Sequence, residues 1–133
     1  MSVAVAYLDA SAAVKRLVQE AESEALGALL DTTGALISSE ILAVELGCFV
    51  ARGAPSVSGP RAQLMLAGME LVAFSSAIRG RAAAPFEPPQ RALDAIHLAS
   101  ALHLELTSLV FVSYDSRQLA AAEACGLSCS SPT

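Results

Sequence analysis

The sequence lacks tryptophan and has few aromatic residues of any kind, with two tyrosines and four phenylalanines among 133 residues. Basic residues are also few, since eight lysines and arginines face thirteen acids and the formal net charge is −5. Such a chain does not bind nucleic acid through its whole surface, because phosphate binding depends on lysine and arginine. It can still bind a phosphodiester through cations held by its acidic groups.

Cysteine is scarce, and no long hydrophobic run is present. Cys48, Cys125 and Cys129 form an odd number without metal-site spacing, so they are interpreted as reduced packing thiols. Although 54% of the residues are hydrophobic, no run approaches the roughly 18 uncharged apolar residues of a membrane span. No basic residue or secretory cleavage pattern precedes Asp9, so we expect a cytoplasmic protein without membrane association.

Short apolar stretches alternate with helical stretches along the chain. Strands are expected over residues 3–8, 35–38, 70–74 and 108–113. Helices are expected over 11–18, 22–31, 39–52, 61–69, 76–84, 90–105 and 116–126. Ser11 is the expected N-cap of the first helix, and residues 53–60 form the clearest loop. The pattern predicts a single domain over residues 1–133, a three-layer α/β/α fold with a central parallel sheet of four to five strands.

Two carboxylates follow predicted strands. Asp9 ends the first strand, and Asp115 lies two residues beyond the last one. In parallel α/β folds the ligand site lies beyond the carboxyl ends of the central strands, so both acids share one rim if their strands are neighbours. Each of them alone could instead cap the helix that follows it.

Glu45 interrupts the apolar stripe of the helix over 39–52. It lies at helical spacing from Ile41, Leu42, Cys48 and Phe49. An unpaired buried carboxylate is costly, so Glu45 needs a cation, a proton, an arginine or water nearby.

Asp94 and His97 interrupt the long helix over 90–105, whose residues are otherwise nearly all apolar or small from Ala92 to Leu102. Aspartate is unfavourable inside a helix, because its side chain competes for backbone groups. Asp94 could pair with Arg91 or with His97 on neighbouring turns. His97 itself is interpreted as a core or supporting residue, not as a metal ligand.

The four acids together predict a metal site. Clustered carboxylates repel one another, and their pKa values rise unless a divalent cation compensates. Hard oxygen ligands without a cysteine or a histidine pair favour Mg²⁺ or Mn²⁺ over zinc. Asp9 and Asp94 are the expected direct ligands, and Glu45 and Asp115 are expected to ligate directly or through water.

Four segments carry a family resemblance: YLDASAAVKRL (7–17), ISSEILAVELGCFVAR (37–52), LDAIHLASAL (93–102) and VFVSYDSRQLAAAEACGL (110–127). In this order they resemble the PIN domain, specifically the VapC-type toxins of bacterial toxin–antitoxin pairs. The resemblance covers essentially the whole chain. It implies a hydrolase, an Mg²⁺- or Mn²⁺-dependent endoribonuclease whose products carry 5′-phosphates and 3′-hydroxyls. The family's metal-binding acids fall on Asp9, Glu45, Asp94 and Asp115.

The resemblance also implies supporting residues and partners. Ser113 stands where the family often has threonine, and the supporting hydroxyls are Ser11 and Ser113. The candidate phosphate contacts are Lys15, Arg16, Arg52 and Arg91. The implied partners are RNA, a cognate antitoxin, and a second copy in a homodimer or a higher toxin–antitoxin assembly. The alternative hypothesis is a catalytically inactive PIN-like module that holds an antitoxin or RNA without cleaving it.

Apolar residues between positions 61 and 86 exceed what one short helix face can bury. Core packing accounts for most of them, and some are expected to line a groove or a dimer seam. These residues are Leu64, Met65, Leu66, Met69, Ile78 and Phe86.

Overall fold

The structure is a computed structural model that describes residues 5–53 and 58–133. Within these residues a five-stranded parallel sheet has the order β3-β2-β1-β4-β5. Its strands are β1 (Val5–Leu8), β2 (Ala35–Ser39), β3 (Glu70–Val72), β4 (Leu109–Val112) and β5 (Ser128–Ser130). The central strand β1 pairs with β2 on one side and with β4 on the other.

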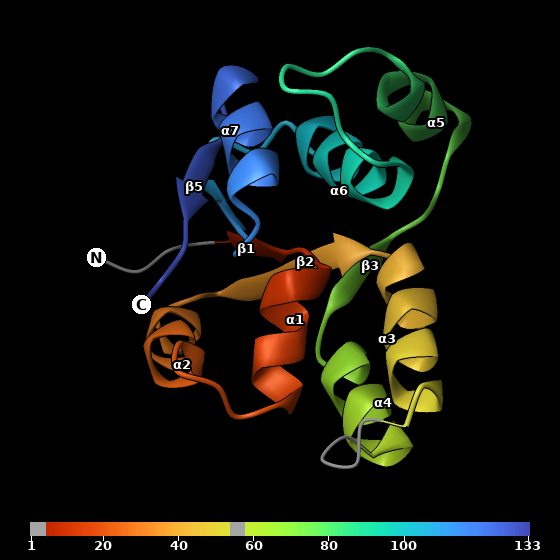
Figure 1. The fold of residues 1–133 in the computed structure, drawn as a ribbon. Helices are drawn as coiled ribbons and strands as arrows, with labels where there is room; N and C mark the ends of the chain where they lie inside the picture. Colours follow the sequence, from red (N-terminus) through yellow and green to blue (C-terminus); the bar gives the residue numbers. More distant parts are fainter. Residues whose placement is uncertain (1–4, 54–57) are drawn as a thin grey trace.

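Helices cover both faces of this sheet, as Figure 1 shows. They are α1 (Ala10–Leu17), α2 (Ser23–Asp31), α3 (Ile41–Ala51), α4 (Gly59–Ala67), α5 (Ser76–Ala83), α6 (Ala92–His103) and α7 (Ser116–Ala124). The chain moves in one direction along the sheet from β1 to β3 and in the other from β4 to β5, so right-handed crossovers place α1–α4 on one face and α5–α7 on the other. The predicted three-layer α/β/α fold is confirmed.

Alternating side chains of the central strands form a core on each face of the sheet. Tyr7 and Phe111 point toward α6 and α7 and stack with ring centroids 5.5 Å apart. Leu8 and Val112 point to the opposite face and pack against Leu26 of α2. Each such fully buried leucine or phenylalanine stabilises the fold by about 1.5–3 kcal/mol relative to an exposed one.

The element boundaries match the sequence expectations closely, with three differences. Helix α1 is capped by Asp9 and not by Ser11, because the chain turns directly after β1 and the Asp9 carboxylate accepts from the Ala12 amide. Strand β5 was not expected, because its sequence, Ser-Cys-Ser, has no apolar run. Helix α6 begins at Ala92, so Asp94 lies in its first turn.

Two of the expectations extend beyond the described residues. Residues 3 and 4 of the expected first strand lie outside them, as do residues 54–57 of the expected loop. None of the described helices is both long and apolar enough to span a bilayer.

The excess of apolar residues between 61 and 86 is mostly core. Leu66, Ile78 and Phe86 are buried, as expected for the members of the set that pack in the core. Met65 and Met69 are partly buried against the packing core, and Leu64 is 76% exposed. The residues are buried because α4 packs on α3 and α5 packs on α6.

The three cysteines are free. Cys125 and Cys129 pack against the core on the α6–α7 side of the sheet. Cys48 is exposed on α3, so its interpretation as a packing thiol is wrong. It lies two residues after Leu46, which forms the buried face of α3 together with Leu42, so its side chain is rotated by about 200° from that leucine.

Candidate active site

The candidate site lies where β1 and β4 end. The two strands are parallel neighbours, and Leu8 is in register with Val112. Their carboxyl ends therefore share one edge, with Asp9 directly after β1 and Ser113 directly after β4. The crossovers that leave these two strands run to opposite faces of the sheet, which makes this edge the switch point where α/β folds bind ligands.

Asp9 is buried and receives hydrogen bonds from both sides of the switch point. Its carboxylate accepts from the Ala12 amide at 2.9 Å, from the Ser11 hydroxyl at 2.7 Å and from the Ser113 hydroxyl at 2.7 Å. Burial raises the pKa of the Asp9 carboxyl, and the hydrogen bonds from Ser113, Ala12 and Ser11 oppose that rise.

The turn between β4 and α7 orients both serines toward Asp9. The Tyr114 amide donates to the Ser11 hydroxyl at 2.9 Å, and the Asp115 amide donates to the Ser113 hydroxyl at 3.1 Å. Each hydroxyl oxygen thus accepts one bond, which leaves its proton for the Asp9 carboxylate. The two serines support Asp9 directly.

Asp115 begins α7 as its N-cap. Its Oδ1 accepts from the amides of Arg117 at 3.0 Å and Gln118 at 3.1 Å. The helix-cap interpretation, which the sequence left open, therefore holds for Asp9 and for Asp115 alike. For these two acids a structural role is present whether or not they bind a metal.

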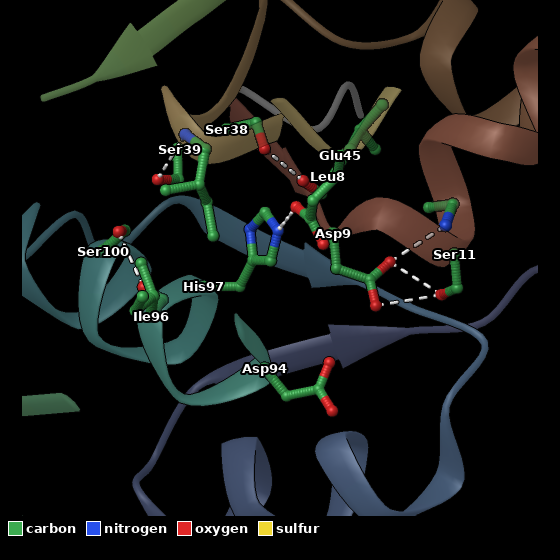
Figure 2. Close-up of polar contacts among 12 residues, drawn as sticks. Leu8, Asp9, Ser11, Ser38, Ser39, Glu45, Asp94, Ile96, His97 and Ser100 are labelled. Carbon is green, nitrogen blue, oxygen red and sulfur yellow. Dashed lines mark hydrogen bonds and ion pairs between the residues drawn. The ribbon is translucent and has the colours of Figure 1, made fainter. Parts of the chain in front are cut away.

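Glu45 reaches the site from α3, where its partner is a histidine and not an arginine. Its Oε1 lies 2.6 Å from Nε2 of His97, which is itself 1% exposed (Figure 2). The Nδ1 atom of His97 lies 2.8 Å from the Tyr7 hydroxyl. The interpretation of His97 as a core and supporting residue agrees with this geometry.

Asp94 projects from the first turn of α6 and is half-buried. Desolvation raises the pKa of its carboxyl, and the negative charges of Asp115, Asp9 and Glu45 raise it further. Among residues 5–53 and 58–133 its carboxylate has no hydrogen-bond or ion-pair partner, so the alternative of a pair with Arg91 or His97 is not realised. Figure 2 shows the carboxylates of Asp94 and Asp9 on the same side of His97.

The charges of the other three acids act on Asp94, but the four carboxylates do not form a ready set of ligands among the described residues. In the part of the chain that the structure describes, no three acidic, histidine or cysteine side chains stand close enough to hold one metal ion. Three of the four carboxylates are instead turned toward protein donors: serine hydroxyls, a histidine and backbone amides. The expected tight cluster is present as an electrostatic group only.

A pocket of about 590 Å³ opens beside Asp94 and Asp115, and two arginines line it. The Arg117 guanidinium donates from Nε to the Pro89 carbonyl at 2.9 Å. Arg91 lines the same pocket and is exposed. Arg117 was not among the candidate phosphate contacts, although its position two residues after Asp115 could have indicated it.

The other candidate phosphate contacts lie in different surroundings. Lys15 is held by Glu22 at 3.2 Å and Glu20 at 3.6 Å, so its charge is already paired. Arg16 lines a separate hollow with residues of α4. Arg52 lies at an apolar groove of about 410 Å³ that Glu45 also lines.

Gln118 is a further polar residue of the site that the sequence analysis missed. It is fully buried; its Oε1 lies 3.0 Å from the Ser113 hydroxyl, and its Nε2 donates to the Asp94 carbonyl at 3.2 Å. It therefore connects the ends of β4 and α6. Its helical spacing from the buried Ala121 and Ala122 was the signal that it faces inward.

Comparison with protein families and sequences gives matches over most of the chain. The model of the PIN domain family matches residues 6–124. Ribonuclease VapC35 of Mycobacterium tuberculosis (strain H37Rv) is 39% identical over 132 residues, which cover 95% of this chain and 96% of that protein. Ribonuclease VapC46 of the same strain is 35% identical over 135 residues, with 98% and 100% covered.

Solved structures share the fold. VapBC2 from Rickettsia felis, bound to a DNA fragment from its promoter, superposes with a TM-score of 0.69 at 13% identity, covering 97% of this chain and 99% of that one. FitAcB from Neisseria gonorrhoeae superposes with a TM-score of 0.62 at 19% identity, covering 96% and 97%. At such low identity these likenesses concern the fold alone.

Proposed function

The chain belongs to the PIN domain family, among its VapC-type members, and from that premise we propose that it is a metal-dependent endoribonuclease, the toxin of a toxin–antitoxin pair. Relatives at 35–39% identity over nearly the whole chain are named ribonucleases, which supports the reaction. The observation that carries the proposal is Asp94. Its carboxylate is half-buried and lies within the field of three other carboxylates.

The residues present fit Mg²⁺ or Mn²⁺. All four candidate ligands are hard oxygen donors, and the negative charges of Asp115, Asp9 and Glu45, which help to raise the pKa of Asp94, support a cation beside it. Asp9 and Asp94 would hold the ion, with Glu45 and Asp115 binding it directly or through water. When bound, the ion supplies an activated water and neutralises negative charge on the phosphate.

The protein's own residues then position the reaction. Ser11 and Ser113 hold the Asp9 carboxylate from both sides. Arg91 and Arg117, on the wall of the pocket beside Asp94, attract the RNA phosphates adjacent to the cleaved bond. Their two positive charges offset the net negative charge of the chain where the substrate must approach.

The toxin–antitoxin part of the proposal adds a cognate antitoxin and a homodimer or higher assembly as partners. An apolar groove beside Glu45 supports it, because Val44 is 66% exposed and Leu93 is 49% exposed at its margin. Co-expression with the antitoxin should give a complex that elutes earlier than the protein alone in size-exclusion chromatography. A chain that stays monomeric under both conditions would contradict this part.

The test of the enzyme is cleavage of structured and unstructured RNA with Mg²⁺ and with EDTA. We expect cleavage with Mg²⁺, none with EDTA, and none by Asp9→Asn, whose amide can still cap α1. Asp31→Asn is the matched control, because Asp31 is exposed and precedes β2, at the opposite edge of the sheet. Cleavage that persists in EDTA or in Asp9→Asn would refute the proposal.

The same assay tests the alternative of an inactive binding module. One observation favours that alternative: among the described residues no three candidate ligands stand together. An inactive module would bind RNA or antitoxin with unchanged affinity in EDTA and would release no cleavage products in Mg²⁺ or Mn²⁺.

A further inference from the structure

We propose that His97, itself held by Tyr7, is a positioning residue that fixes the Glu45 carboxylate at the candidate metal site. The inference rests on the proposed function, since it assigns a role at the same site. His97 interrupts the apolar face of α6, and it is not one of the four candidate metal ligands.

The imidazole of His97 is held on both nitrogens inside the core. His97 is 1% exposed, with Tyr7 at 2.8 Å from Nδ1 and Glu45 at 2.6 Å from Nε2. Tyr7 is fully buried on the central strand β1, where it stacks on Phe111 with ring planes 13° apart. The ring of Tyr7 also meets His97 edge-on, at 5.8 Å between centroids.

The two hydrogen bonds of His97 are compatible with one placement of the protons. A carboxylate only accepts hydrogen bonds, so the bond to Glu45 places a proton on Nε2 of His97. In the tautomer that has its proton on Nε2, Nδ1 is an acceptor, and the Tyr7 hydroxyl is placed to donate there. Tyr7 thus fits the tautomer that holds Glu45.

The hydrogen bond to His97 restricts the position of the Glu45 carboxylate. The glutamate projects from α3 and has three rotatable side-chain torsions, whereas the candidate ligand Asp9 directly follows β1 and Asp94 lies in α6. His97 fixes one oxygen of Glu45 from α6, so α3 and α6 are joined at the site. Metal-binding carboxylates are usually held by such outer hydrogen bonds, whose loss weakens metal binding roughly 10–100-fold.

The test compares His97→Gln with His97→Asn by Mn²⁺ titration calorimetry. The glutamine amide reaches the position of Nε2 and can still donate to Glu45, whereas the asparagine amide reaches only the position of Nδ1 near Tyr7. We expect His97→Asn to weaken Mn²⁺ binding roughly 10–100-fold and His97→Gln to recover most of that loss. His103→Asn, at the exposed end of the same helix, should bind like the unaltered protein.

Two further variants keep the test decisive if His97→Asn does not fold. Tyr7→Phe removes only the hydroxyl, and we expect it to weaken Mn²⁺ binding by a smaller factor than His97→Asn. In a Glu45→Gln background, His97→Asn and Tyr7→Phe should have no further effect on Mn²⁺ binding, because their action passes through Glu45. Thermal unfolding in EDTA identifies the variants that are folded.

The inference is overturned if folded His97→Asn and Tyr7→Phe bind Mn²⁺ like the unaltered protein, or if their losses persist in the Glu45→Gln background. Failure of the proposed function looks different. In that case the unaltered protein itself binds no Mn²⁺ and cleaves no RNA, which overturns both proposals together.

Discussion

The carboxylates that follow strands and the carboxylates that project from helices are held in different ways at the same rim. Asp9 and Asp115 each cap a helix and receive backbone hydrogen bonds. Glu45 is held by one histidine, and Asp94 has no partner for its carboxylate among the described residues. The strand-end acids therefore have a structural reason to be present, whereas no hydrogen bond within the described residues supplies one for the Asp94 carboxylate.

The same difference appears in the electrostatics. Burial raises the pKa of Asp9, but three hydrogen-bond donors oppose that rise. The pKa of Asp94 is raised by desolvation and then by the charges of Asp115 and Asp9, with no donor to its carboxylate in the described chain. Because negative charges and no donor surround the Asp94 carboxylate in the described chain, a cation stabilises the site most when it binds beside Asp94.

The largest expected effect is that of Asp94→Asn on RNA cleavage. A metal ion stabilises the charge of the transition state by several kcal/mol, and the variant lacks one proposed carboxylate ligand of that ion. Cleavage should therefore slow by about 10²–10³-fold. The melting temperature in EDTA should stay the same or rise, because the change removes a repelled charge. Cleavage rates and thermal unfolding measured on one preparation check both. Unchanged cleavage by Asp94→Asn would show that the reaction does not need the Asp94 carboxylate.

The next effect is the stability difference between Asp9→Ala and Asp9→Asn. Both variants lack the charge, but only asparagine keeps an oxygen that can accept from the Ala12 amide and the Ser11 hydroxyl, while its NH2 group replaces the oxygen that accepts from Ser113. Asp9→Ala should therefore unfold with a free energy about 1–2 kcal/mol lower than Asp9→Asn. Urea unfolding in EDTA measures the difference. Equal stabilities would show that the cap contributes little.

A smaller difference is expected at Asp115. Its carboxylate accepts two backbone amides and is half-exposed, so Asp115→Ala should be about 1 kcal/mol less stable than Asp115→Asn. The matching pair at Asp94, alanine against asparagine, should show almost no difference, because no hydrogen bond is lost there. A clear difference at Asp94 would mean that its carboxylate also has a structural role.

The smallest effect concerns pH in the absence of metal. A carboxyl whose pKa is raised above its usual 3.8 binds protons more tightly in the folded state, so stability rises as pH falls through the raised pKa toward 3.8. The stabilising effect of Asp94→Asn in EDTA should therefore be greatest at neutral pH and vanish below about 3.8. Urea unfolding of both proteins across this range checks the sign, and saturating Mn²⁺ should abolish the gain.

Much of the fold could be predicted because its signals are local. Continuous apolar runs marked β1 and β4, and the alternation with helices predicted a parallel sheet. From these follows the shared edge of Asp9 and Asp115, since parallel strands end on the same side. Strand β5 was not predicted, because its three small or polar residues form a strand only through pairing with β4.

The parts of the site that could not be predicted depend on distant residues. Nothing near Glu45 in the sequence indicates that His97, 52 positions later, lies beside it. The cap of α1 shifted from Ser11 to Asp9 because helix starts are uncertain by a residue or two without the cap geometry. Whether the four acids bind a metal is a property of their side-chain arrangement, which no spacing in the chain specifies.

The helix-cap role of Asp9 has a consequence for how such sequences change over generations. A lineage released from selection for cutting RNA would still be selected for abundance, and abundance follows folding stability. Asp9 and Asp115 would then persist as helix caps while position 94 drifts freely, most readily to asparagine. In a survey of descendants, the residue at position 94 would therefore distinguish chains that still cut from chains that merely fold.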